Sequence, residues 1–224
     1  MAERPVFIPQ DGMGTLVEEI GIEFKWHAGL APSQKVKNIE ALHKSAKQQG
    51  LAPLLEVSTK SKDELGMRLS AFNLRVLVGE VGEIPLECAF QGSKVFEGGG
   101  PYRELFHVDG REAKKDARIR ESGALTSFNF EGQEFPLSPE TAFYDWLYIK
   151  ALLHLRGKLD LMNQYAGFTD IEFNPKRSKN CQARSCATYV ALHERGMLEE
   201  AMKSRDTFIS TIEGSLDQQG ELFE

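Results

Sequence analysis

The 224-residue chain contains few cysteines and no long hydrophobic run. No stretch approaches the roughly 20 apolar residues that a membrane helix needs, so we expect no membrane span. Residues 1–5 are not followed by the apolar segment of a signal peptide, which predicts that the chain is not exported. The three cysteines lack C-x-x-C spacing, and the five histidines form no H-x-x-x-H pair. These absences favour a reduced, cytoplasmic protein that needs neither a metal ion nor another cofactor.

Basic residues are in the minority, because 27 lysines and arginines face 33 aspartates and glutamates, for a formal net charge of −6. A chain with this balance is not expected to coat nucleic acid nonspecifically. Basic residues nevertheless gather within residues 35–47 and 176–179, whereas much of the acid lies elsewhere. These two clusters are candidates for holding a nucleic-acid strand transiently, and the alternative for the first cluster is an ordinary solvated helix face.

What is present is a globular mixture of 41% hydrophobic and 27% charged residues. Alternating or apolar runs predict strands, and capping signals with helical periodicity predict helices. Strands are expected within residues 4–8, 22–26, 54–58, 125–130, 133–137 and 168–173, where 125–130 and 133–137 form a hairpin. Helices are expected within residues 33–50, 86–96, 138–157, 159–165, 181–194 and 197–212.

This order of elements predicts an α+β fold, mostly helical with a small β-sheet. Ser33 is expected to cap the first helix, and Ser138-Pro139-Glu140 has the signals of a helix start. Residues 1–212 are expected to form one domain. Residues 213–224 are polar and acidic, a composition compatible with a disordered tail.

The segment of residues 86–96 carries the most informative pattern. On a continuous helix, Glu87, Gln91 and Lys94 stand at positions i, i+4 and i+7 and share one face. This face would combine an acid/base group, a hydrogen-bonding amide, and an amine that serves as a cation or a nucleophile. The alternative is a surface helix with ordinary charged residues.

Three segments resemble the NADAR family, whose fold is YbiA-like. Residues 69–72 resemble its short F-S-N-F loop, and residues 86–96 resemble its E-H-x-Y-Q-x-x-K-F helix. Near the C-terminus, residues 171–172 and 180–183 resemble its V-E segment and its later G-N-x-L-G helix start. The resemblance covers roughly residues 54–194. Residues 24–27, 33–35 and 143–148 are similar to the subgroup paired with DarT-type toxins, which ADP-ribosylate guanine in DNA.

The resemblance implies an antitoxin and hydrolase that removes ADP-ribose from guanine bases in DNA, without a metal. Its substrate is then ADP-ribosylated DNA, its product is ADP-ribose, and a DarT-type toxin encoded nearby is its cognate partner in a toxin–antitoxin system of phage defence. Two alternatives stay open. One is an N-glycosidase of a small nucleotide or riboflavin-pathway intermediate, and the other is a non-catalytic module that binds ADP-ribose or the toxin.

By the same resemblance, Glu87 is the catalytic acid/base, because a carboxylate stabilises the positive charge that develops on the ribose or activates water. Lys94 attacks C1 of the ribose or, if it stays charged, holds a phosphate or hydroxyl. Asp170 is the candidate for a late acidic residue, with Glu172 as the alternative. Candidate ligand-binding residues are Ser70, Asn73, Gln91, Glu172, Asn180 and Trp26.

Three of the ligand-binding candidates, Asn73, Asn180 and Trp26, were selected for different reasons. Ala71 stands where the family has Asn, and Asn73 is the candidate to replace it. Asn180 would present its amide at a helix start. Trp26 would stack on a base or adenine, and the alternative is a partly buried packing residue.

Overall fold

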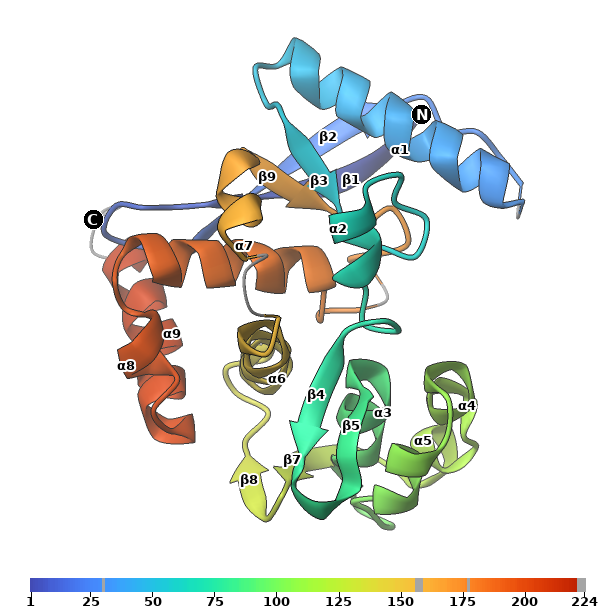
Figure 1. Cartoon of the computed structure of the whole chain (residues 1–224), viewed down its shortest axis with the longest axis vertical. Helices are drawn as coiled ribbons and strands as arrows, with labels where there is room; N and C mark the ends of the chain where they lie inside the picture. The colour runs from blue at the N-terminus through green and yellow to red at the C-terminus, as the bar shows by residue number, and fades with distance from the viewer. Residues whose placement is uncertain (30, 156–158, 177, 221–224) are drawn as a thin grey trace.

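The computed structural model describes residues 1–29, 31–155, 159–176 and 178–220. A four-stranded sheet has the order β2-β1-β9-β3. Its strands are β1 (Ala2–Pro9), β2 (Val17–Phe24), β3 (Leu54–Glu56) and β9 (Gly167–Thr169). β1 pairs antiparallel with β2 and with β9, whereas β3 runs parallel to β9. The sheet forms the upper part of the molecule in Figure 1 and joins segments from both ends of the chain.

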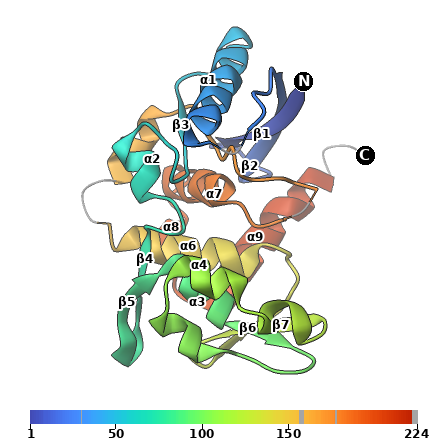
Figure 2. The same ribbon diagram turned by 90° about the vertical axis from the view of Figure 1, so that its right-hand side faces the viewer.

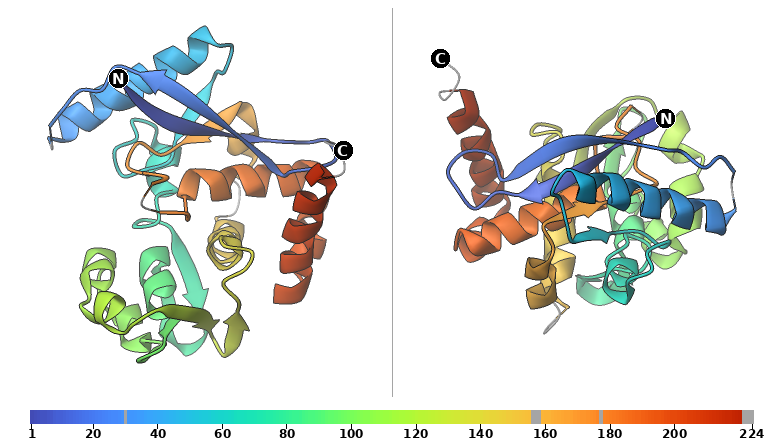
Figure 3. Two further views of the ribbon diagram at one scale, coloured as in Figure 1. Left: turned by 180° about the vertical axis from the view of Figure 1, so that it is seen from behind. Right: turned by 90° about the horizontal axis from the view of Figure 1, so that it is seen from above.

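Two long helices cover the two faces of this sheet. Neighbouring strand residues point to opposite faces, and Val6 packs with α1 (Pro32–Gln48) while Phe7 belongs to the main core with α7 (Gln182–Glu194). Figure 3 shows α1 and the β1–β2 hairpin on the outer side of α7. The expectation that Ser33 caps α1 is wrong. The N-cap is Ala31, and Pro32 begins the helix because its fixed φ suits the first turn.

The second half of the molecule is built around α6 (Ala142–Leu153), which packs between α7, α3 (Leu86–Gly92) and α9 (Arg205–Gly220). Asp145 of α6 is almost fully buried and accepts hydrogen bonds from Arg184 and Ser185 of α7 at 2.8 and 2.6 Å. The helix begins at Ala142, four residues after the expected start at Ser138. Its expected end at Gly157 lies outside the described residues.

Two smaller sheets complete this half. One pairs β4 (Arg75–Val78) with β5 (Gly82–Pro85), and the other has the order β6-β7-β8. β7 (Leu125–Phe130) and β8 (Gln133–Phe135) form the expected hairpin. The remaining short elements are α2 (Glu64–Arg68), α4 (Gly110–Lys115), α5 (Arg118–Glu121), α8 (Leu198–Ala201) and the 3₁₀ helices η1 (Gly79–Val81), η2 (Arg103–His107) and η3 (Leu159–Gln164). The α+β prediction is confirmed, with three small sheets among the described residues rather than one.

The expected continuous helix over residues 86–96 is wrong. α3 ends at Gly92, and β6 (Lys94–Phe96) follows directly. A side chain at position 92 would place its Cβ 2.5 Å from the ring of Phe106, so only glycine permits this close packing. Beyond it, the chain pairs with β7, with Lys94 opposite Phe128. Lys94 therefore begins a strand instead of extending the helix.

The C-terminal region also differs from the expected single helix over residues 197–212. It contains α8 and then α9, separated by a turn. Ser204 Oγ accepts a hydrogen bond from the backbone N–H of Thr207 at 3.1 Å, which caps the start of α9. The expected tail boundary at residue 213 falls inside α9, which continues to Gly220, and residues 221–224 lie outside the described part. No helix in the described part is long and apolar enough to cross a membrane.

Candidate active site

A cavity of about 740 Å³ is lined by residues from both halves of the molecule. The half that contains the four-stranded sheet supplies β1, α1, α7 and the loop after β9, and the other half supplies α3, β6, β7, α4 and α6. In Figure 2, α1 and the four-stranded sheet lie above α7, and α3, β6 and β7 lie below α6. The lining residues are Arg4, Trp26, Lys35, Ala71, Phe72, Glu87, Phe90, Gln91, Lys94, Lys114, Leu125, Phe128, Tyr144, Asp170, Ile171, Glu172, Phe173, Asn174, Ser178, Asn180 and Gln182.

α3 places Glu87 and Gln91 on the cavity wall, where the side chain of each is about 5% exposed. They stand one helical turn apart, and Gln91 Nε2 donates a hydrogen bond to Glu87 Oε1 at 2.9 Å. Gln91 Oε1 is buried without a hydrogen-bond partner in the described part of the chain. Gly110 at the start of α4 lies against this turn, and a Cβ there would lie 3.3 Å from the Cβ of Glu87. The absence of a side chain at position 110 thus lets α4 close one side of the cavity.

Lys94 reaches the same cavity from the first position of β6. Its Nζ lies 4.8 Å from the ring centroid of Phe90, a contact typical of a cation and an aromatic face. Burial lowers the pKa of Lys94 to about 8, although the nearby Glu87 opposes this shift. At pH 7, roughly a tenth of such an amine is neutral and able to act as a nucleophile.

The glycine run at residues 98–100 fixes the backbone of Lys94 and does not line the cavity. Gly100 has φ +96°, and a Cβ there would lie 2.3 Å from the carbonyl oxygen of Lys94. Phe96 and Gly99 form a β-bridge, so the run is a tight turn after β6.

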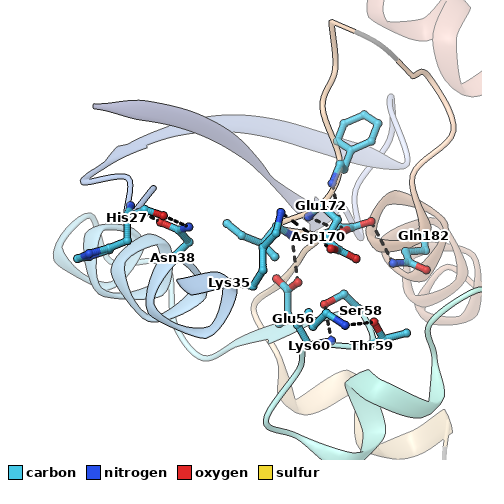
Figure 4. A network of polar contacts seen from close by, with 12 residues as sticks. His27, Lys35, Asn38, Glu56, Ser58, Thr59, Lys60, Asp170, Glu172 and Gln182 are labelled. Carbon is cyan, nitrogen blue, oxygen red and sulfur yellow. Dashed lines mark hydrogen bonds and ion pairs between the residues drawn. The ribbon is translucent and has the colours of Figure 1, made fainter. Parts of the chain in front are cut away.

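Asp170 sits at the end of β9 with its carboxylate held by three N–H groups (Figure 4). Oδ1 accepts from the backbone N–H groups of Glu172 and Phe173 at 2.9 and 3.2 Å, and Oδ2 accepts from Gln182 Nε2 at 3.0 Å. Gln182 Oε1 in turn accepts from the backbone N–H of Ala71 at 2.7 Å. Burial raises the pKa of Asp170 to about 6, and the three donors oppose this shift.

A second buried carboxylate, Glu56 of β3, lies below Asp170 in Figure 4. Glu56 accepts hydrogen bonds from the backbone N–H of Ile171 at 3.0 Å and from Thr169 Oγ1 at 2.8 Å. Burial and the neighbouring Asp170 raise the pKa of Glu56 to about 8. Two adjacent carboxylates rarely ionise together, so we assign the negative charge to Asp170, which has more N–H donors, and the proton to Glu56.

Cations and an aromatic ring gather at the sheet side of the cavity. The guanidinium of Arg4 lies 5.3 Å from the ring centroid of Trp26, and Lys35 Nζ lies 5.9 Å from it. Lys35 also forms an ion pair of 3.9 Å with Glu172. A flat ring next to two cations suits a nucleobase attached to a diphosphate.

Asn180 lines the cavity two residues before α7 and adds a second buried amide oxygen. Its Oδ1 has no hydrogen-bond partner among the residues described. Buried acceptors left unpaired cost free energy unless a ligand or water supplies donors. Asn180 and Gln91 are therefore placed to accept hydrogen bonds from the hydroxyls of a bound sugar.

The cavity brings together seven of the nine residues that the sequence analysis selected. They are Glu87, Lys94, Asp170, Gln91, Glu172, Asn180 and Trp26. Ser70 is fully buried beside the cavity and does not line it. Asn73 lines a different cavity and donates to the carbonyl of Met67 at 2.9 Å. In the basic cluster at residues 176–179, Ser178 lines the cavity, whereas Lys176 and Lys179 do not. Lys179 pairs with Glu140 at 3.6 Å, and Arg177 lies outside the described residues.

Several lining residues were missed because no local pattern marks them. Arg4 and Lys114 belong to charged segments, and Gln182 is one amide in a helix. Tyr144 lies on α6 with Phe143, Trp146 and Tyr148, and it differs from these three in lining the cavity. Its ring meets Phe90 edge to face at 5.0 Å. Only the helical position of Tyr144, on the side of α6 that faces α3, distinguishes it.

The wider site also includes a cysteine on α3. Cys88 is buried on α3, and burial raises the pKa of its thiol to about 11, which fits a packing residue better than a nucleophile. Among the described residues, no group of three or more His, Cys, Asp or Glu side chains is arranged to hold a metal ion.

Comparison with known proteins identifies the family. A family model described as "DarT1-associated NADAR antitoxin" matches residues 2–221, nearly the whole chain. No curated protein matches the chain. The match spans both halves of the molecule and every element that lines the cavity. The chain belongs to the family of DarT1-associated NADAR antitoxins.

Proposed function

We propose that the protein is an antitoxin hydrolase that cleaves the N-glycosidic bond between ADP-ribose and guanine in DNA, and so reverses the modification made by a cognate DarT1 toxin. The observation that carries the proposal is the convergence of Glu87, Gln91 and Lys94 from two elements in one cavity with the buried Asp170. The substrate guanine must leave the base stack to enter a cavity of this size.

In the proposed reaction, the neutral Lys94 Nζ attacks C1 of the ribose, and Glu87 takes up the proton that the amine loses and passes it to the departing guanine nitrogen. The bond to guanine breaks with its electron pair, and a new bond joins C1 to Lys94. Opening of the ribose ring then gives a Schiff base, which water hydrolyses with Glu87 as the base. The products are unmodified guanine and ADP-ribose, and Lys94 and Glu87 regain their starting protonation states.

The other cavity residues position the substrate in this proposal. The Asp170 carboxylate faces the ribose and stabilises the positive charge that develops as the bond breaks. Gln91 and Asn180 accept hydrogen bonds from ribose hydroxyls through their unpaired amide oxygens. Trp26 stacks on the adenine, and Arg4 and Lys35 hold the diphosphate. Every step uses groups of the chain and water, so the proposed reaction needs neither a metal ion nor another cofactor.

The cavity volume favours a second candidate, because about 740 Å³ is within the range of sites that enclose a small ligand. In that case the substrate is a free nucleotide or a riboflavin-pathway intermediate. Product analysis separates the two: the purified chain is incubated with guanine-ADP-ribosylated DNA and, separately, with these small glycosides. We expect the protein to release free ADP-ribose from the modified DNA and to leave the small glycosides uncleaved. Cleavage of the small glycosides alone would overturn the proposal, and ligand binding without any cleavage would identify a binding module.

A further inference from the structure

A second cavity of about 740 Å³ adjoins the candidate active site and shares three lining residues with it, Phe72, Lys114 and Glu172. The loop after β3 forms one side with Thr59 and Lys60, and Glu172 lines the same cavity. The start of α4 forms the other side with Asp109, Gly110 and Arg111, and the turn before β4 adds Asn73. We call this cavity the α4 groove.

The cations of the α4 groove are available to a ligand. Lys60, Arg111 and Lys114 form no ion pair among the residues that the structure describes, whereas many other cations of the chain do. The acids of the groove are already engaged. Asp109 Oδ1 accepts from the backbone N–H groups of Arg111 and Glu112 at 2.7 and 2.9 Å, and Glu172 pairs with Lys35. The groove therefore offers three positive charges that form no ion pair in the described part of the chain, although the net charge of the whole chain is negative.

An aromatic ring lies where the groove meets the active site. Phe72 lines both cavities, and Lys114 Nζ lies 5.5 Å from its ring centroid. Unpaired cations along a groove with an aromatic ring bind single-stranded nucleic acid, since the cations contact phosphates and the ring stacks on a base. A small diphosphate alone would not need this second cavity, because Arg4, Lys35 and Trp26 line the candidate active site and not the groove.

We propose that the α4 groove binds the sugar–phosphate backbone of the DNA strand next to the modified guanine, with Lys60 and Arg111 on phosphates and Phe72 against a neighbouring base. The inference rests on the proposed function. The scissile bond then lies between two arms of one substrate: the ADP-ribose extends toward Trp26, and the strand extends toward α4. This assignment differs from the expectation that the basic residues of α1 and of residues 176–179 hold the strand.

The test compares a long and a short substrate. The value of kcat/KM is measured for a modified single-stranded oligonucleotide and for modified guanosine without flanking phosphates, using wild type, Lys60→Ala, Arg111→Ala and the double variant. The value for the oligonucleotide is divided by the value for the modified guanosine, and we expect this ratio to fall about tenfold in the double variant. Arg120→Ala on α5 is the matched control, because Arg120 is exposed and lines neither cavity. A ratio that stays at the wild-type value, or that falls equally in the control, would overturn the groove assignment.

A binding measurement separates failure of this inference from failure of the proposed function. Fluorescence anisotropy with an unmodified single-stranded oligonucleotide is recorded between low and moderate salt, which requires no catalysis. Each removed cation is expected to reduce the slope of log K against log salt by about 0.7. If neither substrate releases ADP-ribose but the slope changes as expected, the proposed function is wrong and the groove assignment stands. An unchanged slope in both single variants contradicts the groove even if cleavage occurs.

Discussion

Gln91 Nε2 donates a hydrogen bond of 2.9 Å to Glu87 Oε1, and the two side chains form one polar unit on the wall of the cavity. The bond fixes the orientation of the carboxylate and leaves Gln91 Oε1 buried and unpaired among the described residues. Lys94 approaches the unit from a strand instead of from the same helix. The acid/base group and the amine are thus held by two different elements, which restricts their relative movement.

Replacing Glu87 by Gln removes the proton donor but keeps the size of the side chain and an oxygen that can accept from Gln91. We expect kcat for ADP-ribose release to fall by about 10²–10⁴-fold, which is the usual contribution of general acid–base catalysis. Calorimetry should show ADP-ribose affinity within a few-fold of wild type. Glu83→Gln on β5 is the control, since Glu83 is exposed and outside the cavity. Full activity of Glu87→Gln would remove Glu87 from the mechanism.

The amine of Lys94 reacts only after it loses its proton. Because the pKa of Lys94 is about 8, we expect kcat to rise between pH 6 and pH 9 and to level off above that value. Borohydride added during turnover should reduce the Schiff base and join ADP-ribose to Lys94, which mass spectrometry of peptides detects. Lys94→Arg keeps the charge and should lose both turnover and trapping. If Lys94→Arg retains most of its activity and wild type is not trapped, Lys94 acts electrostatically.

Trp26 provides the stacking surface in the proposed site. Stacking of a base on an aromatic side chain contributes about 1–3 kcal/mol, so Trp26→Ala is expected to weaken ADP-ribose binding by roughly 10–100-fold. Trp26→Phe keeps an aromatic face and should recover most of the affinity. Calorimetric titration with ADP-ribose measures both variants. Equal affinity in wild type and Trp26→Ala would show that Trp26 is only a packing residue against Phe24, whose ring centroid lies 6.0 Å away.

The buried Glu56 makes the stability of the folded protein depend on pH, and the substitution Glu56→Gln is expected to remove this dependence. The folded state raises the pKa of Glu56 from its usual value near 4.5 to about 8, so the folded protein holds this proton in a range where the unfolded chain has lost it. The resulting stability is complete below about pH 4.5 and is lost as the pH rises through about 8. His43 and Asp170, with pKa values of about 4 and 6, act at lower pH.

The corresponding measurement is the melting temperature between pH 7 and pH 8.5. Wild type is expected to lose stability with rising pH more steeply than Glu56→Gln, because the amide mimics the protonated acid and can keep its contacts with Ile171 and Thr169. Parallel curves for the two proteins would mean that Glu56 is ionised already at pH 7.

Local pattern predicted much of the fold, because strands such as β1 and hairpins such as β7–β8 depend on neighbouring residues. It failed at Lys94, where the helical spacing from Glu87 and Gln91 suggested one face of a helix. Gly92 packs on Phe106 and Lys94 pairs with Phe128, and both contacts involve residues distant in sequence. Lys94 nevertheless lines the cavity, since the strand turns back beside α3. Arg4 and Gln182 carry no local signal, because their roles arise only when the sheet brings β1 and β9 together.

The most direct measurement of the central claim is release of ADP-ribose from DNA. Single-stranded DNA modified on guanine is incubated with the purified protein in the presence of a metal chelator, and products are separated by chromatography. We predict that free ADP-ribose appears and that the strand regains unmodified guanine, with turnover dependent on Glu87. Persistence of the modified base under these conditions, with the protein folded, would contradict the account.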